Sequence, residues 1–279
     1  MSVFPARDGT KLAYHVLGEG TPVVCLPGGP MQDSAYLGDL GGLSGRLQLI
    51  LSDSRGTGRS ETPTDTGSYR CDHLVNDVEA LREHLGLDRI DLLAHSAGTN
   101  VAAMYAARYP ECIGNLVLIT PSTRAVGIIA TPEMRREVVH LRAGEPWFVQ
   151  GSAAFEAIQA EQATHADWEA ITPFTYGRWD AAARAHHASG ERHRNAEAAA
   201  IFGAAGAYDP AATRAALATF GSPVLLLAGE LDVAAAPRVV AEYAGLFPNA
   251  TLVIQPGAGH CPWLDEPTRF TPTIAAFLS

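Results

Sequence analysis

Residues 89–108 constrain the fold of this chain more than any other part of its sequence. The run Arg89-Ile90-Asp91-Leu92-Leu93 is short and mostly apolar, which predicts a buried β-strand, and the alanine-rich segment Asn100–Arg108 predicts a helix. Between them lies Ala94-His95-Ser96-Ala97-Gly98, in which small residues flank a serine. A tight strand-to-helix turn needs small side chains around the residue at its centre. The pattern therefore predicts that Ser96 is held on such a turn as an exposed nucleophile.

Two further polar residues, Asp232 and His260, each follow a predicted strand. The apolar run Pro223–Ala228 leads toward Asp232, and the strand predicted at Thr251–Ile254 is followed by a glycine-rich turn that ends at His260. A serine hydroxyl becomes nucleophilic when a histidine takes its proton and a carboxylate orients that histidine. The carboxyl ends of parallel strands meet at one edge of a sheet, where ligands usually bind. We therefore predict Ser96, His260 and Asp232 as the catalytic residues.

A glycine pair after an earlier apolar strand predicts where a negatively charged oxygen would be stabilised. The sequence Leu26-Pro27-Gly28-Gly29-Pro30 follows directly on the apolar residues from Pro22. Acyl transfer requires backbone N–H groups that point at the developing oxyanion. One such group usually comes from the residue after the nucleophile, here Ala97, and another from a glycine-containing loop. We therefore predict the N–H groups of Gly29 and Ala97 as the oxyanion hole.

Strand and helix patterns alternate along most of the chain. The pair Asp8–Gly9 predicts the turn of an N-terminal hairpin, and Leu74, Val78 and Leu81 recur at helical spacing. Because strands that alternate with helices usually form parallel sheets, we predict an α/β fold with a mostly parallel sheet covered by helices on both faces. The other elements of this core are predicted at 23–26, 48–52, 71–85, 115–120 and 237–247.

A long segment, residues 121–220, interrupts this alternation after the sixth predicted strand. It has no convincing strand and is too long to be a loop without structure of its own. We therefore predict a core formed by residues 1–120 and 221–279, and a helical cap over the site formed by residues 121–220. Small-molecule pockets are mostly apolar, so we expect some cap aromatics to form the cap's own core and others to bind substrate. The substrate-binding candidates are Trp147, Trp168, Trp179 and Phe202.

Together these motifs resemble the α/β-hydrolase fold family over nearly the whole chain, and most of all its branch related to proline iminopeptidases. The resemblance rests on Gly28-Gly29-Pro30, the turn at Ser96, Asp232, His260 and the stretch Asp53-Ser54-Arg55-Gly56-Thr57-Gly58-Arg59-Ser60, which is similar to the D-x-R-G-x-G-x-S motif of these enzymes. We expect a structural role for this stretch, in which Asp53 pairs with Arg55 beneath the glycine loop. Two positions differ from the iminopeptidases: Pro27 replaces their usual histidine, and Ala97 replaces their usual tryptophan.

The resemblance and the three predicted catalytic residues imply a serine hydrolase that cleaves a small ester, lactone or amide through an acyl-enzyme intermediate. Three alternatives remain open. A proline iminopeptidase-like aminopeptidase would need a carboxylate for the substrate's ammonium group, for which Glu197 and Glu230 are the candidates. A carbon–carbon bond hydrolase would share the catalytic residues and the cap. A non-catalytic small-molecule receptor would not need all three catalytic residues.

Composition narrows the expected partners to a small-molecule substrate. The chain has 279 residues and a net charge of −10, so it would repel nucleic acid and anionic membranes. No apolar run approaches the roughly 20 residues that span a bilayer, and the N-terminus has no secretory signal pattern.

Four scattered cysteines predict reduced thiols in a cytoplasmic protein. We expect no cofactor and no metal, because the histidines lack the spacing of metal ligands. The charged stretch 191–194 is predicted to be a solvated helix face. The sequence leaves the oligomeric state open.

Overall fold

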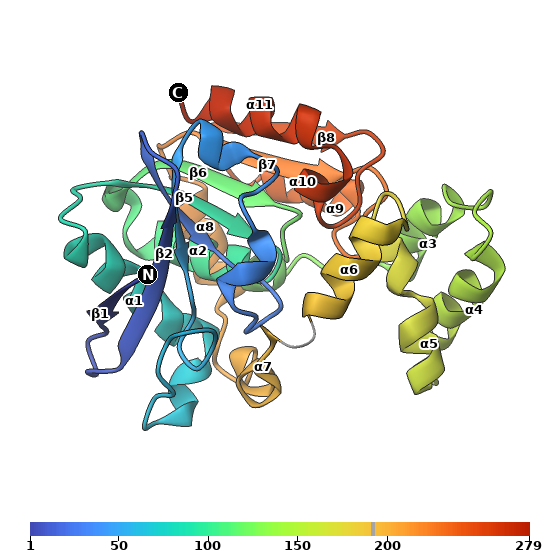
Figure 1. The fold of residues 1–279 in the computed structure, drawn as a ribbon, viewed down its shortest axis with the longest axis horizontal. Coiled ribbons are helices and arrows are strands. Elements are labelled where there is room, and N and C mark those ends of the chain that lie inside the picture. The colour runs from blue at the N-terminus through green and yellow to red at the C-terminus, as the bar shows by residue number, and fades with distance from the viewer. Residues whose placement is uncertain (191–192) are drawn as a thin grey trace.

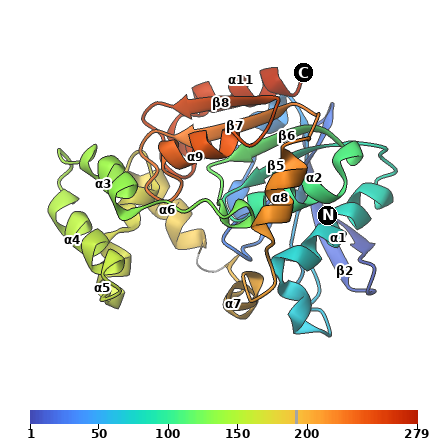
Figure 2. The same cartoon turned by 180° about the vertical axis from the view of Figure 1, so that it is seen from behind.

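The computed structural model describes residues 1–190 and 193–279, which form an eight-stranded sheet with helices on both faces (Figure 1; Figure 2 from behind). The strand order is β1-β2-β4-β3-β5-β6-β7-β8. β1 and β2 form an antiparallel hairpin, β2 also runs antiparallel to β4, and all the other neighbouring strands are parallel. The strands are β1 (Ser2–Pro5), β2 (Lys11–Leu17), β3 (Pro22–Leu26), β4 (Gln48–Ser52), β5 (Ile90–His95), β6 (Ile113–Ile119), β7 (Val224–Gly229) and β8 (Ala250–Gln255).

The core is divided into two layers, one on each face of the sheet. Successive side chains of a strand point to opposite faces, so Leu92 of β5 packs in one layer and Leu93 in the other. Helices α1, α2, α8 and α9 supply apolar residues to the first layer, and α10 and α11 to the second. The bounds of these helices are α1 (Cys71–His84), α2 (Gly98–Arg108), α8 (Pro210–Leu217), α9 (Pro237–Ala244), α10 (Pro262–Asp265) and α11 (Pro267–Phe277).

The structure confirms the α/β fold predicted from the alternation of strands and helices. The predicted strand at residues 48–52 coincides with β4, whereas β5 begins at Ile90 and continues to His95, beyond the predicted end at Leu93. The longer strand arises because Ala94 and His95 still pair with residues of β6. Small and polar residues weaken an apolar pattern, but they do not prevent backbone pairing inside a sheet.

The described residues of the insertion after β6 form helices. α3, α4 and α5 project together beyond the sheet, whereas α7 lies beside the short helix η3 (Thr66–Tyr69) of the core (Figure 1). α8 packs against α2, so this last part of the segment 121–220 belongs to a helical layer of the core. The helices of the insertion are α3 (Pro132–His140), α4 (Phe148–Gln159), α5 (His165–Ala170), α6 (Ala181–Gly190), α7 (Ala196–Phe202) and α8. Within residues 1–190 and 193–279, no helix has the length and apolarity required to traverse a bilayer.

The chain that enters α7 pairs with the loop that follows β3. Gln32 and Arg194 form an isolated antiparallel bridge, and the N–H of Asp33 donates to the carbonyl of His193 at 2.9 Å. Residues 191 and 192 of the predicted helix face lie outside the described residues. Arg194 lies in this bridge and not in a helix, because the backbone of the loop after β3 offers it a partner.

Candidate active site

Ser96 lies on a tight turn between β5 and α2. Its φ of 51° is in the left-handed region, which a residue with a Cβ adopts only where the surroundings enforce it. The N–H of Ser96 donates to the carbonyl of Ile119 at 3.0 Å, which fixes the turn to the end of β6. Ala94 is fully buried, and a Cβ on Gly98 would collide with the carbonyl oxygen of Pro27. The small residues seen in the sequence are therefore required by close packing around the serine.

The structure brings Ser96, His260 and Asp232 into one hydrogen-bonded chain. Asp232 follows β7 and His260 follows β8, so all three residues lie at the carboxyl ends of parallel strands. The distance from Ser96 Oγ to His260 Nε2 is 2.8 Å, and from His260 Nδ1 to Asp232 Oδ2 it is 2.7 Å. Asp232 Oδ1 accepts the N–H groups of Ala234 and Ala235 at 2.8 and 3.0 Å. The carboxylate is thus held in place. It favours the tautomer with the proton on Nδ1, so that Nε2 is free to accept the proton of the serine hydroxyl.

Burial and charge act in opposite directions on His260. Burial lowers the pKa of its imidazole, but the charge of the adjacent Asp232 and their hydrogen bond outweigh this effect and raise the pKa above the usual value of 6.5. The neighbouring His95 ring lies 4.9 Å away, centroid to centroid. Burial first, and then repulsion from His260, lower the pKa of His95 well below 6.5. The pKa values of the two adjacent imidazoles are therefore shifted in opposite directions, toward the charged form for His260 and toward the neutral form for His95.

The glycine loop, residues 27–30, lies directly against the nucleophile. A Cβ on Gly28 would lie 2.8 Å from the Cβ of Ser96 and 3.2 Å from the nitrogen of Ala97. Gly29 has a φ of 112°, which only glycine adopts readily. Within residues 1–190 and 193–279, no hydrogen bond of the fold occupies the N–H groups of Gly29 and Ala97. Both predicted donors therefore lie free beside Ser96.

A hydrogen-bond relay through Tyr36 and His95 joins the glycine loop to His260. Gly28 N–H donates to Tyr36 Oη at 2.7 Å, and Tyr36 Oη donates to His95 Nδ1 at 2.7 Å. His95 Nε2–H then donates to the backbone carbonyl of His260 at 2.9 Å. The hydroxyl of Thr120 donates to the same oxygen, also at 2.9 Å. Sequence reasoning missed Tyr36 because it lies in a short helix, η1 (Ser34–Leu37), that carries no motif. Sequence patterns indicated no partner for His95 either.

Asp53 and Arg55 do not pair with each other, which corrects the expectation for the stretch 53–60. Asp53 Oδ1 accepts the N–H of Ser34 at 2.9 Å and its hydroxyl at 2.7 Å, so it anchors the chain just beyond the glycine loop. Arg55 instead forms ion pairs with Asp8 and Asp77. The two side chains do not meet because each is buried among other residues that satisfy its hydrogen-bonding groups. The role of the stretch is still to brace the loops beneath the site.

Two chambers open from the nucleophile. Gly29, Ser96, Arg194 and His260 line both of them. The larger chamber has a volume of about 660 Å³ and extends under α3 and α7, and the smaller one has about 290 Å³ and lies beside α6. Volumes of this order accommodate small organic molecules.

Of the four predicted substrate-binding aromatics, only Phe202 lies on the described wall of a chamber. Trp147 packs edge-on against Phe174 with ring centroids 4.8 Å apart, and Trp179 packs against Tyr176. Trp168 is 58% exposed on α5. Trp147 and Trp179 therefore pack within the insertion and Trp168 faces solvent, so a role of these three residues in substrate binding stays a prediction.

The two candidate ammonium-binding carboxylates lie away from both chambers. Glu230 accepts the N–H of Gly257 at 2.8 Å, which makes it a brace between the loops after β7 and β8. Glu197 is exposed in the first turn of α7. Neither residue lies on the described walls of the chambers.

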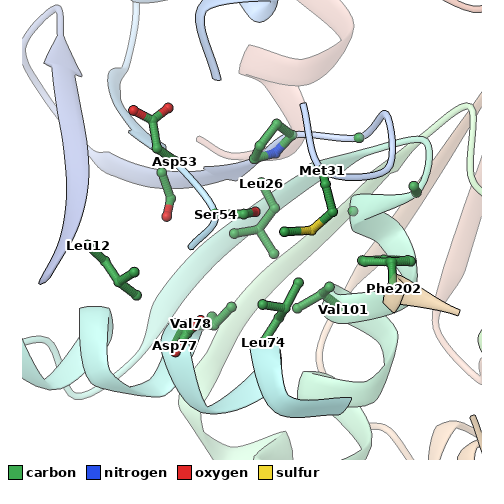
Figure 3. Close-up of a pocket in the computed structure, with 15 residues that line it drawn as sticks. Leu12, Leu26, Met31, Asp53, Ser54, Leu74, Asp77, Val78, Val101 and Phe202 are labelled. Carbon is green, nitrogen blue, oxygen red and sulfur yellow. The ribbon is translucent and has the colours of Figure 1, made fainter. Parts of the chain in front are cut away.

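Figure 3 shows a third cavity, behind the glycine loop, with a volume of only about 30 Å³. Leu26 and Met31 point into it from the loop side, and Leu74 and Val101 point toward them from α1 and α2 (Figure 3). It has room for little more than a water molecule. Phe202 and Ala97 line this cavity as well as the larger chamber, so the two spaces lie next to each other.

The four cysteines are buried and none forms a disulfide. Cys261 lies next to His260 in sequence and lines the smaller chamber. Burial raises the pKa of its thiol well above the usual value. This thiol therefore stays in its protonated form, which is a poor nucleophile.

Comparisons with known proteins place the chain in a family. A proline iminopeptidase from Heyndrickxia coagulans is 36% identical over 108 residues, which cover 39% of this chain and 38% of that protein. A cis-3-alkyl-4-alkyloxetan-2-one decarboxylase from Shewanella oneidensis is 37% identical over 118 residues, which cover 42% of this chain and 37% of that protein. The chain thus spans well under two thirds of the length of either relative.

Among solved structures, an esterase from Rhodococcus sp. ECU1013 is similar with a TM-score of 0.73 and 25% identity, over 99% of this chain and 98% of that one. The family model for the alpha/beta hydrolase fold matches residues 21–267, which include the glycine loop, Ser96, Asp232 and His260. The chain therefore belongs to the alpha/beta hydrolase fold family.

Proposed function

We propose that this chain is a serine hydrolase that cleaves a small-molecule ester, lactone or amide through an acyl-enzyme intermediate. The observation that carries the proposal is the continuous chain from Ser96 Oγ to His260 Nε2 at 2.8 Å and from His260 Nδ1 to Asp232 Oδ2 at 2.7 Å. This arrangement lets a hydroxyl lose its proton to an imidazole as it attacks a carbonyl carbon. No cofactor is needed for this chemistry.

In the proposed mechanism, Ser96 Oγ attacks the substrate carbonyl while His260 Nε2 accepts the hydroxyl proton. Asp232 keeps the imidazole in the correct tautomer and stabilises the positive charge that forms on it. His260 then returns the proton to the departing alcohol or amine, and the acyl group remains on Ser96. A water molecule, activated by the same histidine, releases the acid and restores the serine.

The negative charge on the substrate oxygen would be held by the backbone N–H groups of Gly29 and Ala97. Both groups lie beside Ser96 and are free of internal partners in the described part of the chain. Preorganised donors of this kind stabilise the tetrahedral intermediate more than the planar substrate, which is why they accelerate the reaction. The fixed φ of Gly29 and the anchoring of Gly28 by Tyr36 support this role.

No feature of the described site favours the aminopeptidase alternative. An ammonium group removed from water needs a carboxylate partner. Glu197 and Glu230, the candidates for this partner, are absent from the described walls of both chambers. A carbon–carbon bond hydrolase would use the same three residues, and turnover of a substrate panel separates it from an esterase.

The test is covalent labelling by a fluorophosphonate, followed by a panel of p-nitrophenyl esters and aminoacyl p-nitroanilides. We expect one labelled site, Ser96, and no label on the Ser96→Ala variant. Ser122→Ala removes another hydroxyl from the same larger chamber and should still be labelled. Because a receptor without an activated serine would not react, the absence of labelling would refute the proposal.

A further inference from the structure

The larger chamber is a positively charged space inside an acidic protein. Arg124, Arg135 and Arg194 line it, together with Ser96 and His260. Its wall contains no aspartate or glutamate among the described residues, and the same is true of the smaller chamber. The chain as a whole has a net charge of −10, so three cations in one chamber do not reflect its average composition.

Three other arginines of the insertion and its surroundings have carboxylate partners, whereas Arg184 and Arg214 donate to backbone carbonyls. Arg136 pairs with Glu156 at 2.7 Å, although it is the immediate neighbour of Arg135 on α3. Arg238 pairs with Glu137 at 2.8 Å and Arg142 with Glu145 at 3.2 Å. The part of the chain that the structure describes provides no ion pair for the three arginines of the larger chamber.

Arg135 carries the clearest sign of an unmet interaction. Its Nε atom is buried and has no hydrogen-bond partner among the described residues. A buried donor without an acceptor is unfavourable, and this cost is relieved when an anion with acceptor oxygens enters the chamber. Arg124 and Arg194 are exposed and add positive charge to the same chamber wall. Guanidinium groups match the planar geometry of a carboxylate with two parallel N–H donors.

We propose that the substrate carries a carboxylate, which the larger chamber holds through Arg135 together with Arg124 and Arg194. This inference rests on the proposed hydrolase function and names the substrate class of the same site. Phe202, Val239 and Ile128 also line the larger chamber, so an apolar segment would connect the carboxylate to the reacting carbonyl. The same charges would repel an ammonium group, which argues against aminoacyl amides as substrates.

Arg124 and Arg194 line the chamber from different elements. Arg124 begins the short helix η5 (Arg124–Val126), and its side chain reaches α7, because a Cβ on Gly203 would lie 3.3 Å from Arg124 Nη1. Arg194 lies in the bridge to Gln32 and lines both chambers. The anion would therefore be bound between the core, α3 and α7.

The experiment compares esters that differ only in charge. Phenyl hydrogen adipate against phenyl hexanoate places the carboxylate on the acyl half, and 4-acetoxybenzoate against p-tolyl acetate places it on the alcohol half. We expect kcat/KM for the charged ester to exceed that for its neutral counterpart by about tenfold or more in at least one pair, since charge-assisted hydrogen bonds are the strong ones. Adipate should also inhibit hydrolysis of the neutral ester competitively, and hexane-1,6-diol should not.

Variants then assign the preference to the chamber. Arg135→Gln should lower the charged-to-neutral ratio of kcat/KM by about tenfold, and Arg124→Gln should lower it as well. Arg136→Gln is the matched control, because it removes the same charge from the next position of α3, where the guanidinium faces Glu156. This control should keep the parent ratio. Circular dichroism and urea unfolding of each variant establish that it is folded.

The outcomes distinguish this inference from the proposed function. The carboxylate proposal would be overturned if the neutral ester of both pairs were hydrolysed at least as fast as the charged one while Ser96 was still labelled. The proposed hydrolase function would then stand. A charge preference that Arg135→Gln and Arg124→Gln leave unchanged would also overturn the carboxylate proposal. No turnover of any ester and no labelling of Ser96 would refute the hydrolase, and the carboxylate proposal would fall with it.

Discussion

Replacing Tyr36 with phenylalanine should destabilise the fold and slow the reaction, although Tyr36 does not touch the hydrogen-bonded chain of Ser96, His260 and Asp232. The substitution keeps the ring and removes a hydroxyl that accepts the Gly28 N–H and donates to His95 Nδ1, each at 2.7 Å. Both partners are buried, so each is left with an unmet hydrogen bond.

The expected magnitude follows from those two groups. A buried polar group left unpaired costs about 1–3 kcal/mol, so the pair sets a range of about 2–6 kcal/mol. Tyr36 lines the smaller chamber, from which a water molecule can satisfy one of the two groups. We therefore expect a loss near the lower end, about 2–3 kcal/mol in the free energy of unfolding. The turnover number should fall roughly tenfold with little change in KM, because the loosened Gly28 carries Gly29 with it.

The assay is urea unfolding monitored by tryptophan fluorescence, together with steady-state kinetics on the same preparations. Tyr243→Phe is the matched control: the Tyr243 hydroxyl is also buried, but it has no hydrogen-bond partner among the described residues. Removing it should leave the free energy of unfolding unchanged or raise it. If the free energy of unfolding of the Tyr36→Phe variant lay within about 0.5 kcal/mol of that of the parent protein, the reasoning about the relay would be wrong.

Four further predictions concern the chemistry and the pocket. Ser96→Ala should lower kcat by on the order of 10⁶ with the fold intact, and retention of more than a few per cent of the activity would exclude Ser96 as the nucleophile. Asp232→Asn should cost about 10⁴ by favouring the wrong tautomer of His260. In the parent protein kcat/KM should decline as the pH falls through a His260 pKa above 6.5, because only the neutral ring accepts the serine proton, and a profile flat to pH 5 would contradict this. Phe202→Ala should raise KM or alter the acyl-length preference, whereas Trp168→Ala, on a solvent-facing side chain, should be silent, and an equal response of both would refute the assignment of the pocket wall.

The sequence was informative where chemistry and local backbone pattern coincide. Ser96, Asp232 and His260 could be placed from sequence because each follows an apolar run, and strand ends in a parallel sheet converge at one edge. Gly29 was found for a similar reason, since a glycine pair directly after a strand lets the backbone come close to a ligand at that edge. These inferences needed only the order of elements along the chain.

Contacts between distant segments could not be predicted in this way. Tyr36 belongs to the short helix η1 after β3, and nothing in its neighbouring sequence indicates that it reaches His95. Hydrophobicity predicts that Trp147 is shielded from water, but it does not say whether a substrate or Phe174 provides the shielding. The pairing of Arg55 with Asp8 and Asp77 likewise joins segments that local sequence does not connect.

The bridge between Gln32 and Arg194 has a consequence for how a substrate reaches the serine. Besides this bridge, Asn195 N–H donates to the carbonyl of Met31 at 2.9 Å, and His193 Nδ1 lies 2.7 Å from Asp33 Oδ2. A movement of the start of α7 away from the core would break these contacts and displace the glycine loop that precedes Met31. The start of α7 is therefore fastened to the loop after β3, whereas Ile129, which also lines the larger chamber, is 81% exposed and makes that part of the wall accessible to an entering substrate.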